Sequence, residues 1–252
     1  MTQDYNKYTA EDHAIWGILF DRQLLNLEGK ACSEYLDCIE ELFPHMNNSE
    51  VADFRKVEEA LAKTGWTIEV VEGLIPVEDF FQLLAQKRFC SSTWLRTRTQ
   101  LDYLEEPDMF HDTFGHIPLL MNETYAAFMK KFGELGVKHL NDDRALTALQ
   151  RLYWFTIEFG LMKGAAHAKS GKPQIYGAGV LSSFGEVNHI YEDHKVEVLP
   201  YDISAIAHNH FVNSEIQMRY YLIDSFEQLF HSLDEFDVLL EQGLDIEPQI
   251  VR

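Results

Sequence analysis

The sequence predicts a mainly α-helical protein of the α+β class, with minor, short β-strands. Apolar residues recur at helical spacing through most of the first ninety residues, and further helical patterns follow residue 120. Segments that suit a strand are few and short. The 252 residues contain no internal repeat, low-complexity tract or linker, so we expect a single domain over residues 1–252.

The first part of the chain is expected to be helical. Helices with apolar residues at the helical period are predicted over residues 9–29, 31–43 and 49–65. Thr9 and Asp12 have the spacing of a capping box at the start of the first helix. Gly29 suits the end of that helix, and Gly65 suits the end of the third.

Short strands are expected next, on either side of another helix. Trp66, Ile68 and Val70 alternate with polar residues, as in a half-buried strand. Pro76 suits the first turn of a helix, and the segment RFCSSTWLRTR is rich in β-branched and aromatic residues. The sequence therefore predicts a strand, a helix and a second strand, over residues 66–71, 76–87 and 88–98.

The remaining part of the chain is predicted to be largely helical. Helical patterns cover residues 123–135, 142–162, 214–233 and 234–242. The segment QIYGAGVLSSFGEV, residues 174–187, is rich in glycine and serine and is expected to be a loop that leads into structure.

The composition excludes several classes of partner and compartment. With 21 basic and 41 acidic residues the formal charge is −20, which opposes binding to nucleic acid or to an anionic membrane surface. No run approaches the ~18–20 apolar residues that cross a bilayer, and the N-terminal segment has no secretion-signal pattern. Cys32, Cys38 and Cys90 form no CxxC pair, so we expect free thiols in a reducing cytoplasm.

Two histidines lie close together in the apolar segment PDMFHDTFGHIPLL, residues 107–120. At ~100° per residue, His111 and His116 would point ~140° apart on an α-helix, so their spacing differs from that of the helical zinc motif HExxH. Pro118 disfavours regular helix at Ile117. A short or distorted helix could still direct both rings to one point, and Pro107 suits its first turn.

A carboxylate in an apolar segment suggests a third ligand. Glu158 is the single charged residue of the segment LYWFTIEFGLM. A buried, isolated carboxylate carries a desolvation cost of several kcal/mol, so it needs a cation nearby. That cation could be Arg144 or Arg151, or it could be a divalent metal held together with His111 and His116.

Two imidazoles and one carboxylate are the facial ligand set of non-haem Fe(II) enzymes, which leaves up to three coordination positions open. The same ligands could hold zinc in a hydrolase. The spacing of His111, His116 and Glu158 therefore predicts a metal site and leaves both metals open.

Five segments of the chain resemble the pterin-dependent aromatic amino acid hydroxylases, a family of iron enzymes. In chain order they are EGLIPVEDFF, WLRTRTQLDY, PDMFHDTFGHIPLL, YWFTIEFGL and YGAGVLSSFGE. The resemblance runs from about Tyr8 to about Leu240 and covers the family's catalytic domain. It is greatest to the short bacterial enzymes that hydroxylate phenylalanine. It therefore implies a monomer without a regulatory domain or a C-terminal oligomerisation helix.

The resemblance also assigns roles to individual residues. The family's iron ligands match His111, His116 and Glu158. Its pterin positions match Gly73, Leu74, Ile75, Phe80 and Glu186. Its substrate positions match Arg96, Pro107, Trp154, Phe159, Gly179 and Ser182. In this assignment Arg96 binds the substrate carboxylate through its planar fork, Ser182 helps hold the backbone groups of the amino acid, and Phe80 offers a flat face to the pterin.

Three positions depart from the family pattern. Asp112 stands where many members have glutamate, which shortens the reach of its carboxylate towards cofactor or water. Leu104 replaces a threonine that binds substrate in some members. Asn213 lies near a position associated with the choice among aromatic substrates and matches neither of the common residues there.

The activity implied is hydroxylation of L-phenylalanine to L-tyrosine with Fe(II), a tetrahydropterin and O2, one oxygen atom entering the ring and the other leaving on the pterin. Tryptophan is the alternative substrate, although Trp154 leaves less room for an indole.

Two other classes of protein are the alternatives to a hydroxylase. A zinc hydrolase with the same ligands would act without oxygen or pterin, and a binding protein that had lost the chemistry would be expected to have a damaged ligand set.

Overall fold

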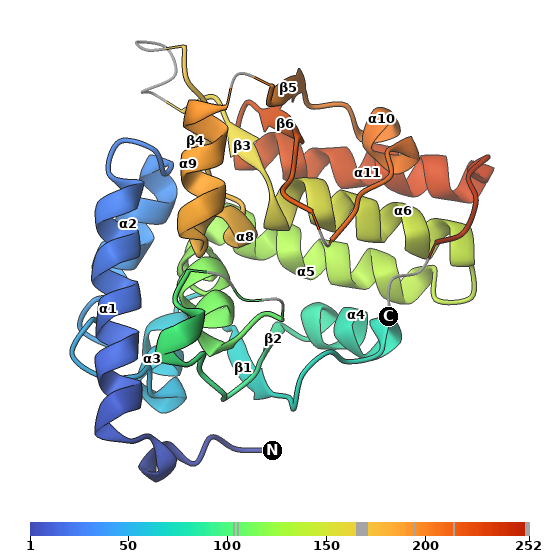
Figure 1. Cartoon of the computed structure of the whole chain (residues 1–252). Helices are drawn as coiled ribbons and strands as arrows, with labels where there is room; N and C mark the ends of the chain where they lie inside the picture. The colour runs from blue at the N-terminus through green and yellow to red at the C-terminus, as the bar shows by residue number, and fades with distance from the viewer. Residues whose placement is uncertain (103, 105, 165–170, 194, 214, 250–252) are drawn as a thin grey trace.

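The computed structural model describes residues 1–252 except 103, 105, 165–170, 194, 214 and 250–252, and it confirms a mainly helical fold with short strands (Figure 1). The α-helices are α1 (Ala10–Leu27), α2 (Ser33–Leu42), α3 (Phe54–Leu61), α4 (Val77–Ala85), α5 (Glu123–Lys138), α6 (Asp143–Tyr153), α8 (Ala178–Leu181), α9 (Phe184–Glu192), α10 (Ile203–His208) and α11 (Phe226–Gln242). The strands are β1 (Thr67–Val70), β2 (Arg88–Ser91), β3 (Leu161–Met162), β4 (Gln174–Ile175), β5 (Glu197–Pro200) and β6 (Arg219–Ile223).

Two further kinds of helix complete the chain. Short 3-10 helices are η1 (Tyr5–Lys7), η2 (Arg98–Gln100) and η4 (Pro118–Met121). Two segments are π-helical, η3 (His111–His116) and η5 (Trp154–Glu158). None of the helices in the described ranges has the length and apolar character needed to span a membrane.

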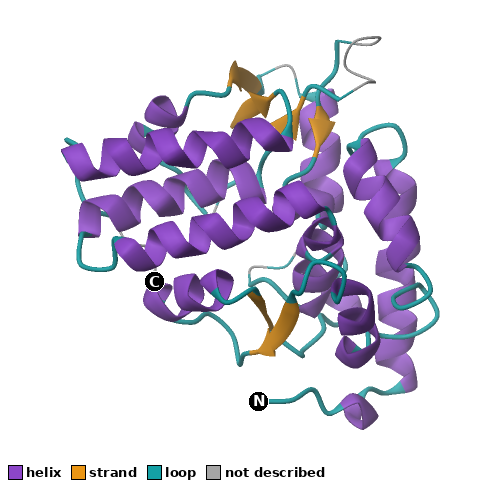
Figure 2. Cartoon of the chain, turned by 180° about the vertical axis from the view of Figure 1, so that it is seen from behind, coloured by secondary structure: helices purple, strands orange, loops and turns teal. Residues whose placement is uncertain are grey.

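The helices form two groups around the π-helical segments. Helices α4 and α11 both pack against α5, and α5, α6 and α11 run side by side in both views (Figures 1 and 2). Helices α1 and α2 stand at the opposite end of the molecule. One cluster of buried apolar side chains connects the two groups, and it includes Phe110 and Phe114 of the segment that carries the histidines.

Two small sheets anchor the ends of the central segments. The larger has the order β4-β3-β6-β5, in which β3 is antiparallel to β4 and parallel to β6, and β5 is parallel to β6. Because β3 begins at Leu161, the sheet fixes the chain immediately after Glu158. The smaller sheet pairs β1 and β2 in parallel, with α4 as the crossover.

The prediction of a helix over residues 214–233, followed by another over 234–242, is wrong in its first part and confirmed over residues 226–242, and residue 214 lies outside the described residues. The structure has strand β6 first, with Tyr220 and Tyr221 both buried, and then one continuous helix α11. Ser225 caps that helix by accepting a hydrogen bond from the Gln228 N–H. A short apolar run cannot be assigned to strand or helix from periodicity alone, and here the aromatic, β-favouring residues and the neighbouring strands decide it.

Three other boundaries also differ from the prediction. The expected helix over 142–162 ends at Tyr153, widens into η5 and gives way to β3. The expected strand over 88–98 is limited to Arg88–Ser91. The expected loop over 174–187 contains β4, α8 and the start of α9. In each case a short element depends on tertiary partners that local sequence does not show.

The start of α1 and the glycine after it follow the prediction, whereas the third helix is shorter than predicted, ends at Leu61 and is capped by Ala62 instead of Gly65. Thr9 caps α1, and Thr9 and Asp12 form the reciprocal bonds of a capping box. Gly29 and Gly65 both have positive φ, of 70° and 75°, beyond the ends of their helices.

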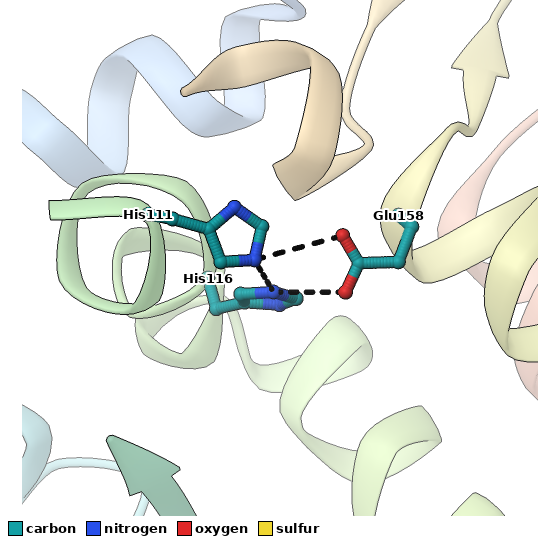
Figure 3. A group of neighbouring side chains, drawn as sticks. All are labelled: His111, His116 and Glu158. Atoms are coloured by element: carbon teal, nitrogen blue, oxygen red, sulfur yellow. Dashed lines mark hydrogen bonds and ion pairs between the residues drawn. The ribbon is translucent and has the colours of Figure 1, made fainter. Parts of the chain in front are cut away.

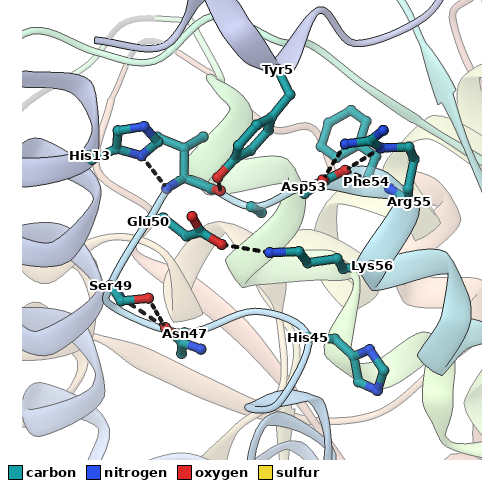
Figure 4. A network of polar contacts seen from close by, with 12 residues as sticks. Tyr5, His13, His45, Asn47, Ser49, Glu50, Asp53, Phe54, Arg55 and Lys56 are labelled. Atoms are coloured by element: carbon teal, nitrogen blue, oxygen red, sulfur yellow. Dashed lines mark hydrogen bonds and ion pairs between the residues drawn. The ribbon is translucent and has the colours of Figure 1, made fainter. Parts of the chain in front are cut away.

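The N-terminal segment is tied to the connection between α2 and α3 (Figure 4). The Tyr5 hydroxyl donates to the Val51 carbonyl at 2.8 Å, and the Val51 N–H donates to His13 Nδ1 at 3.0 Å. Nearby, Lys56 pairs with Glu50 at 2.6 Å. These contacts hold the connecting segment against the start of α1.

Replacing Thr9 with alanine should lower the free energy of unfolding by about 1 kcal/mol, because it removes the side-chain half of a capping box. Urea denaturation followed by far-UV circular dichroism measures this. Thr2→Ala is the control, because Thr2 is exposed near the end of the chain, and its change should stay within about 0.5 kcal/mol. Equal effects of the two substitutions would contradict the role of the cap.

Candidate active site

The two histidines lie at the ends of a π-helical segment. Helix η3 spans His111–His116, so its first and last residues are five positions apart. A π-helical turn pairs residues i and i+5, whereas an α-helical turn pairs i and i+4. The wider turn therefore brings His111 and His116 to nearly the same face, and both rings point towards Glu158 (Figure 3). This is the distorted helix that the spacing and Pro118 require.

The three side chains converge on one point. His111 Nε2 lies 3.2 Å from His116 Nε2 and 3.8 Å from Glu158 Oε2. His116 Nε2 lies 3.2 Å from Glu158 Oε1. Neighbouring corners of an octahedron with ligand bonds of ~2.1 Å are about 3 Å apart. Within the described residues this is the one group of three such side chains arranged for a metal, all ligand atoms lying within 4.8 Å of one another.

Ser182 sets the tautomer of His111. The Ser182 hydroxyl donates to the Ala178 carbonyl at 2.8 Å, so its oxygen is left to accept a hydrogen bond from His111 Nδ1, 2.9 Å away. With its proton on Nδ1, His111 directs the lone pair of Nε2 into the site. Burial lowers the pKa of His111 to about 4, so the ring is neutral at pH 7, as a metal ligand must be.

His116 is held between aromatic rings. The Phe89 ring lies 4.8 Å from it, and the Tyr153 ring stacks on it at 6.3 Å. His116 is 4% exposed, and its Nδ1 is buried without a hydrogen-bond partner among the described residues. The Nε2 atom is therefore the polar atom that meets the other two ligands, and the apolar walls fix its direction.

Glu158 is partnered by the imidazoles and not by an arginine. Burial alone raises its pKa, but His116 and His111, together with a hydrogen bond from Tyr153, hold the pKa below its ordinary range. The arginine alternatives are wrong for the residues described. Arg151 donates to the Ala207 carbonyl and contacts another histidine, while Arg144 is exposed at the start of α6. The carboxylate is thus ionised beside two imidazoles, and this donor set fits a divalent cation.

Glycines allow the segment after β4 to approach Glu158. A Cβ atom on Gly177 would lie 2.5 Å from the Glu158 carbonyl oxygen, and one on Gly179 would lie 3.0 Å from Oε2. The Gly177 N–H also donates to the Gly160 carbonyl at 3.0 Å. A larger residue at Gly177 would displace the backbone that carries the carboxylate.

A second π-helical turn builds an aromatic wall beside the ligands. The Phe159 N–H donates to the Trp154 carbonyl, five residues earlier, at 3.0 Å. The two rings consequently pack with centroids 4.6 Å apart, and the other aromatic neighbour of Trp154 is Phe211 at 4.5 Å. Trp154 and Phe159, predicted from the resemblance as substrate residues, lie together at the two ends of the turn that carries Glu158.

Residues 4–249 match the sequence profile of the biopterin-dependent aromatic amino acid hydroxylases. The chain belongs to this family. It is 41% identical over 250 residues to a phenylalanine-4-hydroxylase of Chromobacterium violaceum, covering 98% of this chain and 82% of that one. It is 43% identical over 231 residues to one of Ralstonia nicotianae, covering 91% of this chain and 71% of the relative.

Solved structures of the family share the fold. The Chromobacterium violaceum phenylalanine hydroxylase with bound iron(III) and 7,8-dihydrobiopterin superimposes with a TM-score of 0.88 at 39% identity, covering 100% of this chain and 90% of that one. The same enzyme with iron and phenylalanine bound gives a TM-score of 0.85 at 37% identity, covering 100% and 91%. These similarities confirm the predicted fold of a family catalytic domain.

Arg96, at the family's substrate-carboxylate position, is already paired within the chain. Its Nε and Nη2 groups both donate to the Asp108 carboxylate at 2.8 Å, and both residues are buried. Asp108 also accepts from the His111 N–H at 3.1 Å, so one carboxylate orients the arginine and the first ligand-bearing residue. Pro107 is exposed and lies before Asp108, so it is not in the first turn as predicted.

The positions that match the family's pterin site come from three segments of the chain. Gly73, Leu74 and Ile75 lie between β1 and α4, where Leu74 is 77% exposed. Phe80 of α4 meets the Tyr153 ring edge-on at 5.3 Å. Glu186 of α9 is partly buried and accepts from the Tyr220 hydroxyl at 3.2 Å. Burial raises the pKa of Glu186.

The three positions that depart from the family pattern have different surroundings. Asp112 is half-buried and accepts a hydrogen bond from the Ser92 N–H at 2.8 Å, and burial raises its pKa to about 7. Leu104 is partly buried between η2 and η3, and Asn213 is exposed in a turn. The shorter carboxylate of Asp112 is thus engaged by the backbone N–H of Ser92, just after β2.

Sequence reasoning missed three residues that support the site. These are Asp108, Tyr153 and Gln217, which contact Arg96, Glu158 and Trp154 respectively. Asp108 and Tyr153 each stand within five residues of a predicted ligand, so a search for polar neighbours of the ligands could have found them. Gln217 has no such signal, because it comes from a distant segment.

Replacing Ser182 with alanine should weaken Fe(II) binding about 10-fold, because it removes the acceptor that fixes the His111 tautomer. Anaerobic Fe(II) titration measures the affinity. Ser183→Ala is the matched control, since Ser183 caps α9. It should cost about 1 kcal/mol of stability and leave Fe(II) affinity unchanged. Unaltered affinity in Ser182→Ala would count against the tautomer argument.

Replacing Gly177 with alanine should lower Fe(II) affinity by at least about 10-fold and cost about 1–3 kcal/mol of stability, because the added Cβ displaces the Glu158 backbone. Metal content after dialysis and thermal melting test the two effects. Gly185→Ala serves as the control, since a Cβ there meets no atom within 4 Å. If both variants kept iron equally, the close approach would not matter for the ligand.

Proposed function

We propose that this protein hydroxylates L-phenylalanine to L-tyrosine, using a tetrahydropterin and O2 at a ferrous ion held by His111, His116 and Glu158. The observation that carries the proposal is the convergence of two imidazoles and one carboxylate whose ligand atoms all lie within 4.8 Å of one another. This donor set occurs here in a member of a pterin-dependent hydroxylase family. Relatives at about 40% identity are phenylalanine-4-hydroxylases.

The ligand side chains are suited to iron in their charge as well as their position. Two neutral nitrogen donors and one carboxylate offset only part of the charge of a divalent ion and occupy one side of it. When bound, Fe(II) and the reduced pterin supply the oxygen-activating chemistry. The chain contributes the fixed tautomer of His111, the aromatic walls around His116 and a low-polarity surrounding for Glu158.

The substrate residues would place the amino acid by two kinds of contact. Asp108 occupies the Nε and Nη2 groups of Arg96, so the substrate carboxylate would bind the remaining Nη1 side of the fork. Trp154 and Phe159 would hold the aromatic ring against the ligands, with Gly179 and Pro107 completing the substrate positions. Such placement is the main contribution a protein makes to a cofactor reaction.

The pterin would bind between the exposed segment Gly73–Ile75 and Glu186. Phe80 lies at 85° to the Tyr153 ring and would offer the pterin ring a flat aromatic surface. The carboxylate of Glu186 would accept hydrogen bonds from the ring nitrogens.

We further infer a single catalytic domain over residues 1–252, since one cluster of buried apolar residues includes side chains from α1 and α11. Its partners are inferred to be L-phenylalanine, O2 and pterin. The charge of −20 opposes nucleic acid and anionic membranes. Cys32, Cys38 and Cys90 are free, which suits the reducing cytoplasm. A monomer remains the expectation from the resemblance.

The alternatives have less support. A zinc hydrolase would use the same ligands but has no need of the pterin positions, and the relatives are hydroxylases. A binding protein that had lost the chemistry would not keep all three ligands in register. Tryptophan as substrate is disfavoured because Trp154 is fixed between Phe159 and Phe211 and narrows the space for an indole.

The proposal predicts that purified protein, loaded with Fe(II) and supplied with tetrahydropterin and O2, converts L-phenylalanine to L-tyrosine. Product analysis with phenylalanine, tyrosine and tryptophan as separate substrates tests it. Activity with zinc and without oxygen would instead indicate the hydrolase. Failure to form tyrosine with iron retained would overturn the proposed function.

Replacing Glu158 with glutamine should lower Fe(II) affinity by more than about 100-fold and abolish tyrosine formation, because a neutral amide is a much poorer ligand. The iron-free protein should still fold and melt cooperatively, because glutamine has nearly the same volume as glutamate. Glu134→Gln on the exposed side of α5 is the control and should alter neither property. Wild-type iron affinity in Glu158→Gln would remove Glu158 from the ligand set.

A further inference from the structure

Gln217 is a buried glutamine whose side chain is used at both ends. It is 7% exposed and lies just before β6. Its Oε1 accepts from the Trp154 indole N–H at 2.8 Å, and its Nε2 donates to the Arg219 carbonyl at 2.6 Å. The second bond fixes which way the amide faces, so that the oxygen points to the indole.

The bond to Gln217 restrains the indole in a way that its aromatic neighbours cannot. Trp154 is stacked on Phe211 at 4.5 Å with 14° between planes, and it packs on Phe159 at 4.6 Å. Contacts on ring faces fix the tilt of a ring but allow it to slide and turn within its plane. A directional hydrogen bond at the ring edge removes that freedom.

Gln217 also contacts a second residue of the predicted site, Glu186, through its backbone. A hydrogen bond from the Gln217 backbone reaches the Glu186 carboxylate and opposes the effect of burial on the pKa of that group. The Tyr220 hydroxyl donates to the same carboxylate. One segment therefore holds both the aromatic wall at Trp154 and the acidic group at Glu186.

We propose that Gln217 is a positioning residue that fixes the in-plane orientation of Trp154 and thereby the preference for a phenyl ring over an indole. This inference rests on the proposed function, because it assigns Trp154 to the substrate wall. Without the bond, the indole N–H of the half-buried Trp154 would lose its partner and the ring would turn to find another. The substrate space beside the Trp154 ring would then have no fixed shape.

The test is a double-mutant cycle between Gln217→Leu and Trp154→Phe. Trp154→Phe keeps an aromatic ring but removes the N–H that Gln217 binds. Gln217→Leu should raise KM for L-phenylalanine about 3- to 10-fold, the effect of losing one neutral hydrogen bond, with kcat changed less than about 2-fold. The ratio of kcat/KM for phenylalanine to that for tryptophan should fall by at least about threefold. In the Trp154→Phe background the same substitution should change neither quantity.

Gln174→Leu is the matched control. Gln174 is also 7% exposed and donates its amide to a backbone carbonyl, that of Ala31, but among the described residues its side chain bonds to no residue of the site. Each leucine variant removes one buried amide, and only Gln217→Leu should change KM and the substrate ratio. Tryptophan emission should shift in Gln217→Leu, and the shift should vanish in the Trp154→Phe background. Gln217→Asn, which withdraws the acceptor by one methylene, replaces Gln217→Leu if the latter does not fold.

The inference is overturned if the Gln217 and Gln174 variants behave alike, or if the effect of Gln217→Leu is equally large without the indole N–H. Failure of the proposed function is recognised separately, because the wild-type protein would then form no hydroxylated product at all. In that case equilibrium dialysis with L-phenylalanine and L-tryptophan gives the same comparison without turnover. An unchanged ratio of the two affinities in Gln217→Leu would also overturn the inference.

Discussion

Two helical turns, each wider by one residue than an α-helical turn, determine the geometry of the candidate metal centre. The first places His111 and His116 on one face although they are five residues apart. The second carries Glu158 and brings Trp154 against Phe159. A regular α-helix at the first place would direct one imidazole away from the site. At the second place it would separate the Trp154 and Phe159 rings from the Glu158 carboxylate. Such turns are rare and occur mostly as single insertions, so the surrounding packing must maintain them.

Segments before and after the two turns hold them in place. The larger sheet holds the residues that follow Glu158, and Gly177 lets the segment after β4 lie against the same backbone. Asp108 holds the start of η3, while the aromatic rings of Phe89 and Tyr153 enclose His116. The ligands therefore approach one another in a weakly polar pocket, where a bound divalent cation would compensate the buried carboxylate.

The sequence was sufficient for the fold class and for the three residues that converge, and insufficient for the features that depend on distant partners. The lone carboxylate at Glu158 and the histidine pair are local signals, because both stand out against apolar neighbours. The sequence predicts a helix where β6 forms, because the short apolar run RYYLI fits the helical period as well as the strand period. Only the pairing of this segment with β3 and β5 decides between the two. The widened turns and Gln217 have no local signature, because each is defined by what other segments place beside it.

The ligand-bearing side chains belong to separate layers of the molecule, His111 and His116 to the segment before η4 and Glu158 to the segment that enters the sheet. A metal held by all three would consequently cross-link these layers as a covalent staple does. A ligand that binds only the folded chain stabilises it by RT ln(1 + [L]/Kd), which is about 2.7 kcal/mol at a hundredfold excess over Kd. Metal availability in the cell would thus govern the lifetime of this chain against proteolysis, and not its turnover alone.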